Sequence, residues 1–140
     1  MKLKEIMTTD VKVVRVNDSL QTAARKMRDS DIGFLPVIDG DQLVGVFTDR
    51  DMIVRSIAEG MDPQAMLGRE LATSPAIYCF DDQEVEDAAR LMHDNQIRRL
   101  VILNRRDRNL VGVVSLGDLA LNADAKLTDK VLQSVFEPVG

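Results

Sequence analysis

An internal repeat constrains the fold of this 140-residue chain more than any other feature. Residues 17–32 return as residues 82–97, at an offset of 65 positions. The stretch VGVFTDRD at 44–51 returns as VGVVSLGD at 111–118, at an offset of 67 positions. Two copies of so long a period indicate two similar units packed together, not an open solenoid. A function that both copies share is therefore expected in a cleft between them.

Hydrophobic spacing in the first copy predicts the order strand, helix, strand, strand, helix. The apolar residues Leu20, Ala23, Ala24 and Met27 fall on one face of a helix, which Asp18 or Ser19 can cap. The other predicted elements are a strand at 11–16, a hairpin of strands 34–38 and 43–48, and a helix at 50–59. Gly60 is well suited to end that last helix.

The second copy predicts the same order of elements. They are strands at 77–80, 100–103 and 110–115, a helix that presents Val85, Ala88, Ala89 and Met92, and a short helix from Asp118. The predicted fold class is therefore α/β, or α+β in terms of layers, with two β-α-β-β-α units. We expect repeat one at 1–60, a linker at 61–70, repeat two at 71–123 and an amphipathic helix or tail at 124–140.

Composition argues against several classes of partner. The net charge of −5 and the pI near 4.9 disfavour a nucleic-acid surface, which would be basic. No segment approaches the roughly 20 apolar residues of a membrane span, and the first residues lack the apolar run of a signal peptide. We therefore expect a cytoplasmic protein that contacts neither nucleic acid nor membrane.

No combination of residues predicts catalysis. Cys79, the only cysteine, lies in a predicted strand and is expected to be an inert buried residue. His93, the only histidine, is expected to be solvated on a helix. These two residues cannot form a zinc site without several suitably spaced carboxylates, and phosphate-loop and dinucleotide-binding motifs are missing from the sequence. We expect no enzyme, no metal and no required cofactor.

Each copy places a hydroxyl and a carboxylate where a buried strand meets a helix. The motif is Val46-x-Thr48-x-x-Asp51 in the first copy and Val113-x-Ser115-x-x-Asp118 in the second. Unpaired N–H groups and the helix dipole favour an anion at such a place. The hydroxyl can bond a phosphate or ribose oxygen, the aspartate can accept from two ribose hydroxyls, and the valine can contact a base. The same spacing is close to a capping box, in which both side chains only satisfy their own helix end.

With these motifs, the chain resembles a tandem pair of CBS domains, the regulatory unit called a Bateman module. The resemblance covers about residues 3–122. It is carried by Ile6-Met7-Thr8, by DIGFLPVID at 31–39, by LVGVFTDRD at 43–51 and by their counterparts in the second copy. The chain is most similar to the small stand-alone prokaryotic members. The resemblance implies that the two repeats pack through their sheets about a pseudo-twofold axis. It also implies two clefts that bind regulatory adenosine ligands: AMP, ADP, ATP, NAD(H) or S-adenosylmethionine.

The resemblance also implies which residues form the two clefts. In the family, the hydroxyl-x-x-Asp motif of one repeat is joined to the entry strand and the central strand of the other. The first nucleotide-binding site would consist of Val46, Thr48, Arg50, Asp51, Thr73, Ala76, Arg98 and Arg99. The second would consist of Thr8, Val11, Gly33, Phe34, Val113, Ser115 and Asp118.

The two predicted sites differ in charge. The first contains Arg50 and the pair Arg98-Arg99, and guanidinium groups bind phosphate in a bidentate manner. The second has Gly33 and Phe34 in the places of the arginine pair. We therefore expect a phosphorylated nucleotide in the first site, and a neutral or cationic adenosine compound, or nothing, in the second. As an alternative, the arginine pair is only a solvated strand entrance.

The predicted function is that of a non-enzymatic sensor of adenosine ligands whose state a partner detects. Because members of the family often form flat four-repeat dimers, a homodimer and an unidentified protein effector are expected. The apolar residues of 126–136 offer a surface for such a contact. Two alternatives stay open: a ligand-independent dimerisation or interaction module, in which the duplicated motifs are only caps, and an enzyme with an unrecognised site.

Overall fold

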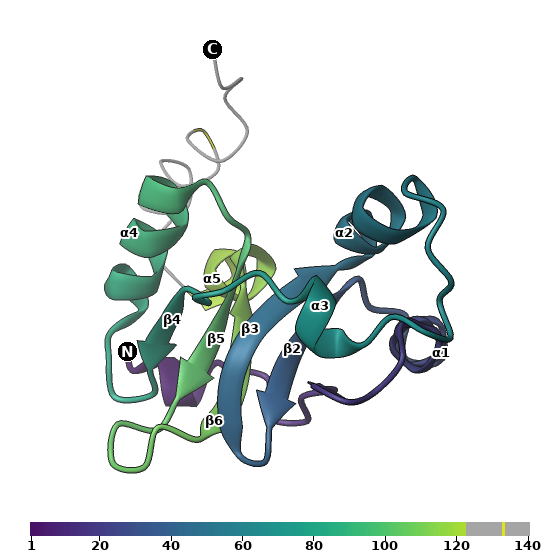
Figure 1. Cartoon of the computed structure of the whole chain (residues 1–140). Helices are drawn as coiled ribbons and strands as arrows, with labels where there is room; N and C mark the ends of the chain where they lie inside the picture. Colours follow the sequence, from purple (N-terminus) through teal and green to yellow (C-terminus); the bar gives the residue numbers. More distant parts are fainter. Residues whose placement is uncertain (123–132, 134–140) are drawn as a thin grey trace. The chain divides into compact units, whose positions relative to one another are not determined.

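The computed structural model describes residues 1–122 and Gln133 (Figure 1). The chain divides into two compact units, residues 12–76 and residues 1–11 with 77–140. We call them the first-repeat unit and the second-repeat unit, after the copy whose strands they contain. The helix or tail predicted at 124–140 lies outside the described residues, apart from Gln133.

The first-repeat unit contains a three-stranded sheet in the order β1-β2-β3. Its elements are β1 (Val14–Arg15), α1 (Leu20–Ser30), β2 (Phe34–Asp39), β3 (Gln42–Thr48), α2 (Asp49–Met52), a π-helix (Ile53–Ile57) and α3 (Gly68–Leu71). Strands β1 and β2 are parallel and are joined through α1, whereas β2 and β3 form an antiparallel hairpin.

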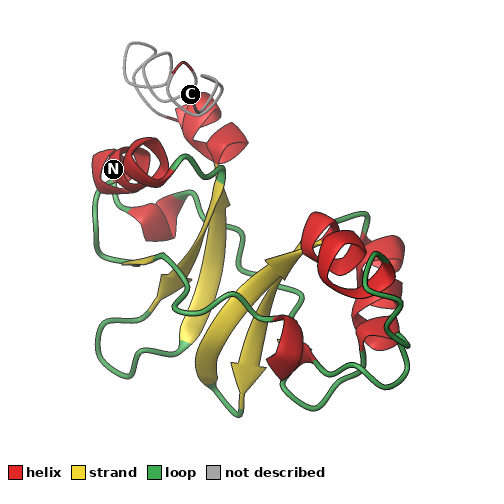
Figure 2. Cartoon of the chain, turned by 45° about the horizontal axis from the view of Figure 1, so that its top comes forward, coloured by secondary structure: helices red, strands yellow, loops and turns green. Residues whose placement is uncertain are grey.

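The second-repeat unit has the same topology, with the sheet order β4-β5-β6. Its elements are a 3₁₀-helix (Leu3–Glu5), β4 (Tyr78–Phe80), α4 (Val85–Asn95), β5 (Arg99–Leu103), β6 (Leu110–Ser115) and α5 (Leu116–Asn122). The predicted α+β class, with a β-α-β-β-α order in each repeat, is confirmed (Figure 2). The packing of the two sheets against one another stays a prediction.

The start of α1 shows how the local sequence sets an element. Ser19 Oγ accepts a hydrogen bond from the Thr22 N–H at 3.1 Å, so Ser19 is the capping residue of the two that were predicted. Asp18 instead accepts from the Arg15 N–H at 2.9 Å and holds the preceding turn. Leu20, Ala23 and Met27 are buried, as the helical spacing predicted.

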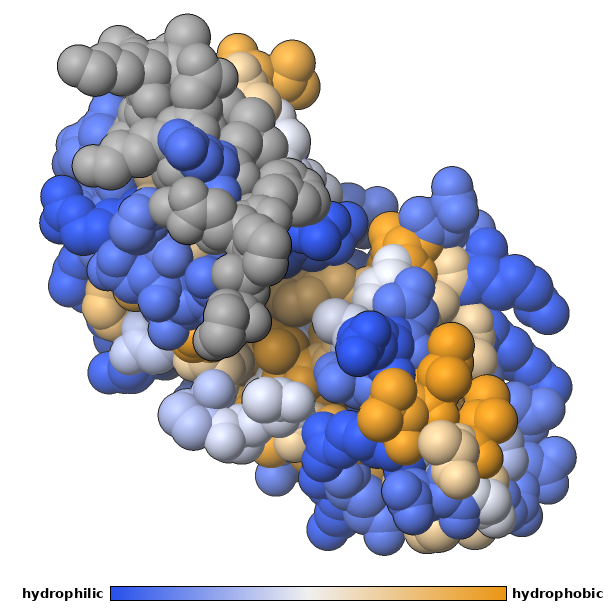
Figure 3. Space-filling model, turned by 90° about the horizontal axis from the view of Figure 1, so that it is seen from above, coloured by the Kyte–Doolittle hydropathy of each residue, from blue (hydrophilic) through white to orange (hydrophobic). Residues whose placement is uncertain are grey.

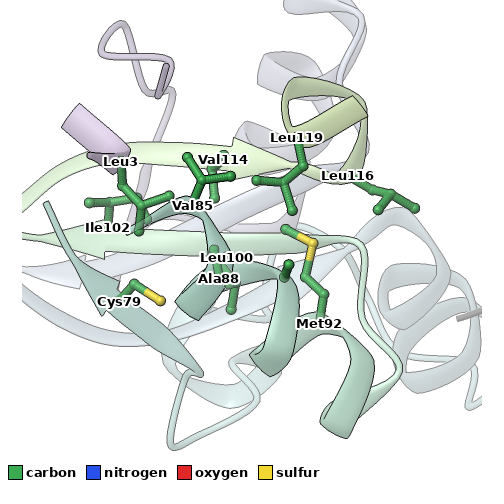
Figure 4. Close-up of a cluster of buried hydrophobic side chains, with 11 residues drawn as sticks. Leu3, Cys79, Val85, Ala88, Met92, Leu100, Ile102, Val114, Leu116 and Leu119 are labelled. Atoms are coloured by element: carbon green, nitrogen blue, oxygen red, sulfur yellow. The ribbon is translucent and has the colours of Figure 1, made fainter. Parts of the chain in front are cut away.

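Each unit has its own hydrophobic core, made where helices pack on a sheet. In the first-repeat unit, α1 packs against Leu35, Val37 and Phe47, together with Met66 and with Leu71 of α3. The core of the second-repeat unit (Figure 4) contains Leu3, Cys79, Val85, Ala88, Ala89, Met92, Leu100, Ile102, Val114, Leu116 and Leu119. Leu3 shows that the N-terminal segment packs with the second copy, although it precedes the first copy in the sequence. The predicted domain boundaries themselves stay a prediction.

The helix predicted at 50–59 is not a regular α-helix. Only Asp49–Met52 is α-helical, and the next turn is a π-helix in which the Ala58 N–H donates to the Ile53 carbonyl at 2.9 Å. The spacing of apolar residues does not distinguish an α-helical turn from a π-helical turn, and for this reason the sequence predicted a regular helix. Gly60 has a positive φ of 68°, in agreement with its predicted place after the helix.

An extended segment pairs with the free edge of each sheet's hairpin. In the first-repeat unit, the Thr73 N–H donates to the Val46 carbonyl at 2.8 Å, and the Val46 N–H donates to the Thr73 carbonyl at 3.2 Å. Thr8 and Val113 exchange the same two bonds in the second-repeat unit, at 2.9 and 3.0 Å. Gly45 precedes Val46, and Gly112 precedes Val113. Both glycines are buried.

We expect Gly45→Ala to lower the free energy of unfolding by about 1–3 kcal/mol. The new Cβ would lie 2.5 Å from the Thr73 carbonyl oxygen. The extended segment that contains Thr73, which we call the entering segment, would therefore have to move away from β3. Urea denaturation followed by circular dichroism measures the change. Gly117→Ala is the matched control, since the closest atom to its Cβ is Ser115 Oγ at 3.5 Å and alanine favours the helix. An equal loss in both variants would contradict this explanation.

Candidate functional site

The junction of β3 and α2 holds the first of the two duplicated motifs. The Asp51 N–H donates to Thr48 Oγ1 at 3.3 Å, and the Thr48 N–H donates to Asp51 Oδ2 at 3.0 Å. These reciprocal bonds form a capping box, which satisfies N–H groups at the start of the helix. The capping interpretation of the motif therefore describes a real contact.

The junction of β6 and α5 repeats this arrangement in the second-repeat unit. The Asp118 N–H donates to Ser115 Oγ at 3.1 Å, and the Ser115 N–H donates to Asp118 Oδ2 at 2.8 Å. Both hydroxyls and both carboxylates are half-buried. The two motifs thus have the same internal geometry, each within its own unit.

Capping uses only one oxygen of each carboxylate. Within the part of the chain that the structure describes, no group donates a hydrogen bond to Oδ1 of Asp51 or of Asp118. An ionised carboxylate has room for about four hydrogen bonds. The cap and a bound ligand can therefore use the same aspartate at the same time.

Each unit brings a second threonine next to its motif through the edge pairing described above. Thr73 is hydrogen-bonded to Val46, which lies two residues before Thr48 on β3. Since side chains alternate along a strand, Val46 and Thr48 point to the same face. In the second-repeat unit, Thr8 is bonded in the same way to Val113, two residues before Ser115.

Two further predicted site residues lie in the segments that contain these threonines, and a third lies in α2. Ala76 lies three residues beyond Thr73 in the entering segment, and Val11 lies three residues beyond Thr8; both are half-buried. Arg50 is exposed in the first turn of α2, where its N–H donates to Asp49 Oδ1 at 2.9 Å.

The structure places Arg98 and Arg99 beside the motif of their own unit. The Leu116 N–H donates to the Arg98 carbonyl at 2.8 Å, and Arg99 is opposite Ser115 in the β5–β6 hairpin. Gly33 and Phe34 have the same places in the first-repeat unit. There the Asp49 N–H donates to the Gly33 carbonyl at 2.9 Å, and Phe34 is opposite Thr48. The sequence did not lead us to expect these neighbours, although the hairpin register implies them. The combination of each pair with the other motif stays a prediction.

Arg55 is a residue of this region that the sequence reasoning missed. It lies in the π-helix, and its Nη1 donates to the Leu71 carbonyl at 2.8 Å and contacts Thr73 Oγ1 at 3.4 Å. Thr73 is a predicted site residue. The signal that could have revealed Arg55 is a cation four residues after Asp51 on the same helix.

Comparison with known proteins assigns both repeats of the chain to one family. A model of the CBS domain matches the chain twice, over residues 3–57 and 68–123. The chain belongs to the CBS domain family. The predicted tandem pair of CBS domains is thereby confirmed. The CBS domain-containing protein YhcV of Bacillus subtilis (strain 168) is 40% identical over 120 residues, which cover 86% of this chain and 84% of that protein.

Two solved CBS-pair structures extend the comparison. The crystal structure of Hypoxic Response Protein I with two coordinated zinc ions is 32% identical, with a TM-score of 0.80, and covers 89% of this chain and 100% of its own. The crystal structure of CBSX2 in complex with AMP is 26% identical, with a TM-score of 0.74, and covers 92% of this chain and 98% of its own.

Residues 1–122 of this CBS pair, with Gln133, contain no group of three or more His, Cys, Asp or Glu side chains that could hold a metal ion. His93 Nδ1 lies 3.1 Å from Asp94 Oδ1 at the end of α4, where both side chains are solvated. In that same part of the chain, no helix has the length and apolar character to span a membrane.

Cys79 is fully buried in the core of the second-repeat unit (Figure 4). Burial, with a smaller contribution from the negative charge of Asp87, raises the pKa of its thiol to about 11. Since the thiolate is the reactive form, the sequence-based expectation of an inert cysteine agrees with this environment.

We expect Cys79 to react with Ellman's reagent at least about a hundredfold more slowly in the native CBS pair than in urea, because its raised pKa lowers the thiolate fraction and the core excludes the reagent. Stopped-flow absorbance measures both rates. Arg90→Cys in a Cys79→Ala background supplies an exposed thiol on α4 as the control. Rapid labelling of native Cys79 would contradict the core assignment.

Proposed function

We propose that this CBS-domain protein is a non-enzymatic regulatory module that binds adenosine-containing ligands: AMP, ADP, ATP, NAD(H) or S-adenosylmethionine. The observation that carries the proposal is the duplicated motif, in which each aspartate caps its helix with Oδ2 and keeps Oδ1 available within the described residues. Membership of the CBS domain family and the AMP complex of the related CBSX2 support the choice of ligand.

The chemistry of the first motif suits a nucleoside. Asp51 Oδ1 would accept from a ribose hydroxyl. Thr48 Oγ1 already accepts from the Asp51 N–H, so its own O–H would donate to a phosphate or ribose oxygen. The Val46 side chain, on the same face of β3, would contact the base. Because the cap holds Asp51 in place, little side-chain entropy would be lost when the ligand binds.

The proposal keeps the predicted difference between the two sites. A phosphorylated nucleotide is assigned to the first site on the basis of Arg50, Arg98 and Arg99. A neutral or cationic adenosine compound, or no ligand, is assigned to the second. To regulate anything, the ligand must bind two states of the protein with different affinity. A homodimer and an unidentified protein effector, which would detect that change, are part of the proposal.

A second candidate function, a ligand-independent interaction module, is favoured by a surface of the first-repeat unit. Ile53, Val54 and Ile57 of the π-helix are 57%, 49% and 62% exposed, and Met61 is exposed beside them in the sequence. Hydrophobic side chains gather over α2 and this helix (Figure 3). Large exposed apolar side chains in one place are typical of a contact with a partner.

A matched pair of ligands tests the proposed role of Asp51. We expect AMP to bind the wild-type protein about tenfold to a hundredfold more tightly than 2′,3′-dideoxy-AMP, because only AMP can donate to the carboxylate. In Asp51→Ala this preference should disappear, and the free energy of unfolding should fall by about 0.5–2 kcal/mol through loss of the cap. Isothermal titration calorimetry and urea denaturation measure the two effects.

Asp49→Ala is the control, since it removes the same charge from the same helix turn at a variable position of the motif, which is Leu116 in the second copy. It should keep the preference for AMP. An interaction module would give another result: Asp51→Ala would lose stability, but AMP, ATP, NADH and S-adenosylmethionine at millimolar concentration would leave the melting temperature of the wild type unchanged. That outcome would rule out the adenosine sensor.

A further inference from the structure

Arg55 is hydrogen-bonded to residues 71 and 73, in the segment that pairs with β3 beside the first motif. Its Nη1 donates to the Leu71 carbonyl at 2.8 Å and reaches Thr73 Oγ1 at 3.4 Å. Thr73 is in turn fixed to Val46 on β3 by two backbone hydrogen bonds. The guanidinium is therefore held next to a residue that is predicted to contact ligand.

The opposite edge of this guanidinium stays available. Arginine has five N–H donors, and Nη1 carries two of them. Among the described residues, no group accepts a hydrogen bond from Nε or Nη2 of Arg55, and no carboxylate forms an ion pair with it. The Nε–Nη2 edge presents two parallel N–H groups, the geometry that binds phosphate in a bidentate manner. An arginine already anchored at one nitrogen loses less freedom when it binds an anion.

The position of Arg55 along the helix places it near the motif. It follows Asp51 by four residues, and residues so spaced lie on one face of a helix. It also lies inside the π-helix, and single π turns are frequent at functional sites. The Asp51 carboxylate, the hydroxyls of Thr48 and Thr73, and the Arg55 guanidinium thus all come from the first-repeat unit.

The second-repeat unit lacks this cation. The residue four positions after Asp118 is Asn122, whose Nδ2 donates back to the Asp118 carbonyl at 2.8 Å. The counterpart of Arg50, in the turn before, is Gly117. The helix that follows the motif therefore carries two arginines at these positions in one unit and none in the other.

We infer that Arg55 binds the phosphate of the ligand and makes the first motif selective for adenosine nucleotides over the uncharged nucleoside. Thr73 would hold the guanidinium in place, and the Nε–Nη2 edge would bind the phosphate. The inference rests on the proposed function and adds a specificity-determining residue to it.

The test compares two ligands that differ only by a phosphate, AMP and adenosine. In Arg55→Gln, the dissociation constant of AMP should rise about tenfold or more, whereas that of adenosine should stay nearly unchanged. In Arg55→Lys, the dissociation constant of AMP should lie between those of the wild type and Arg55→Gln, because lysine keeps the charge but cannot bind phosphate in a bidentate manner. In the wild type, AMP but not adenosine should shift the Nε–H resonance of Arg55 in a ¹⁵N-resolved NMR spectrum.

Arg25→Gln, on an exposed position of α1, removes the same charge from the same unit and should change neither constant. If Arg55→Gln weakens AMP and adenosine equally, Arg55 only holds the entering segment, and the inference is overturned while the proposed function stands. If AMP does not shift the Nε–H resonance of Arg55, the inference is likewise overturned and the proposed function stands. If the wild type binds neither compound, both the inference and the proposed function are overturned.

Discussion

The backbone pairing of Val46 with Thr73 is the contact on which the candidate site of the first-repeat unit depends. Strand β3 is the edge of its sheet, and the two hydrogen bonds hold the entering segment against that edge. An unpaired edge would otherwise be exposed to other chains. The pairing requires the residue next to Val46 to lack a Cβ, and Gly45 fulfils that requirement. Gly112 has the same place beside Val113, where a Cβ would lie 3.0 Å from the Thr8 carbonyl oxygen and 2.5 Å from Met7 Sδ.

Capping and ligand binding are often treated as competing explanations of a hydroxyl-x-x-aspartate motif. Here they describe different atoms of the same side chain. Oδ2 of each aspartate completes the cap, and Oδ1 lies outside it. A carboxylate that is fixed by its own helix is already oriented before a ligand arrives, which is the condition for a precise binding site. The stability of the helix end and the geometry of the candidate site therefore come from the same pair of hydrogen bonds.

The parts of the fold that the sequence predicted well are those set by local interactions. The β2–β3 hairpin lies within one residue of its predicted bounds, and Ser19 was one of two expected caps. The π turn could not be predicted, because the apolar spacing of 53–57 fits either kind of turn. Nor could the packing of Leu3 with the second copy, since an apolar residue in an N-terminal segment does not indicate which of two similar sheets it will cover.

The same distinction applies to the candidate site. Repetition revealed Thr48 and Asp51, together with Ser115 and Asp118, because each has a counterpart. It could not reveal Arg55, which is replaced by Asn122 in the other copy. Nor does the sequence indicate the hydrogen bond from Arg55 to the Leu71 carbonyl, because these residues are 16 positions apart and only the fold brings them together.

What the two copies share and where they differ follow from separate physical requirements. The glycine at the paired strand, the hydroxyl and the aspartate recur because the edge pairing and the cap each need that residue type. Arg50 and Arg55 are exposed on the helix that follows, where the backbone places no such demand, and their counterparts are Gly117 and Asn122. The charge at these two positions can therefore differ between the copies while both keep the edge pairing and the helix cap. Because the cap holds both carboxylates in the same way, a difference in ligand preference has to come from such neighbours, not from the repeated motif.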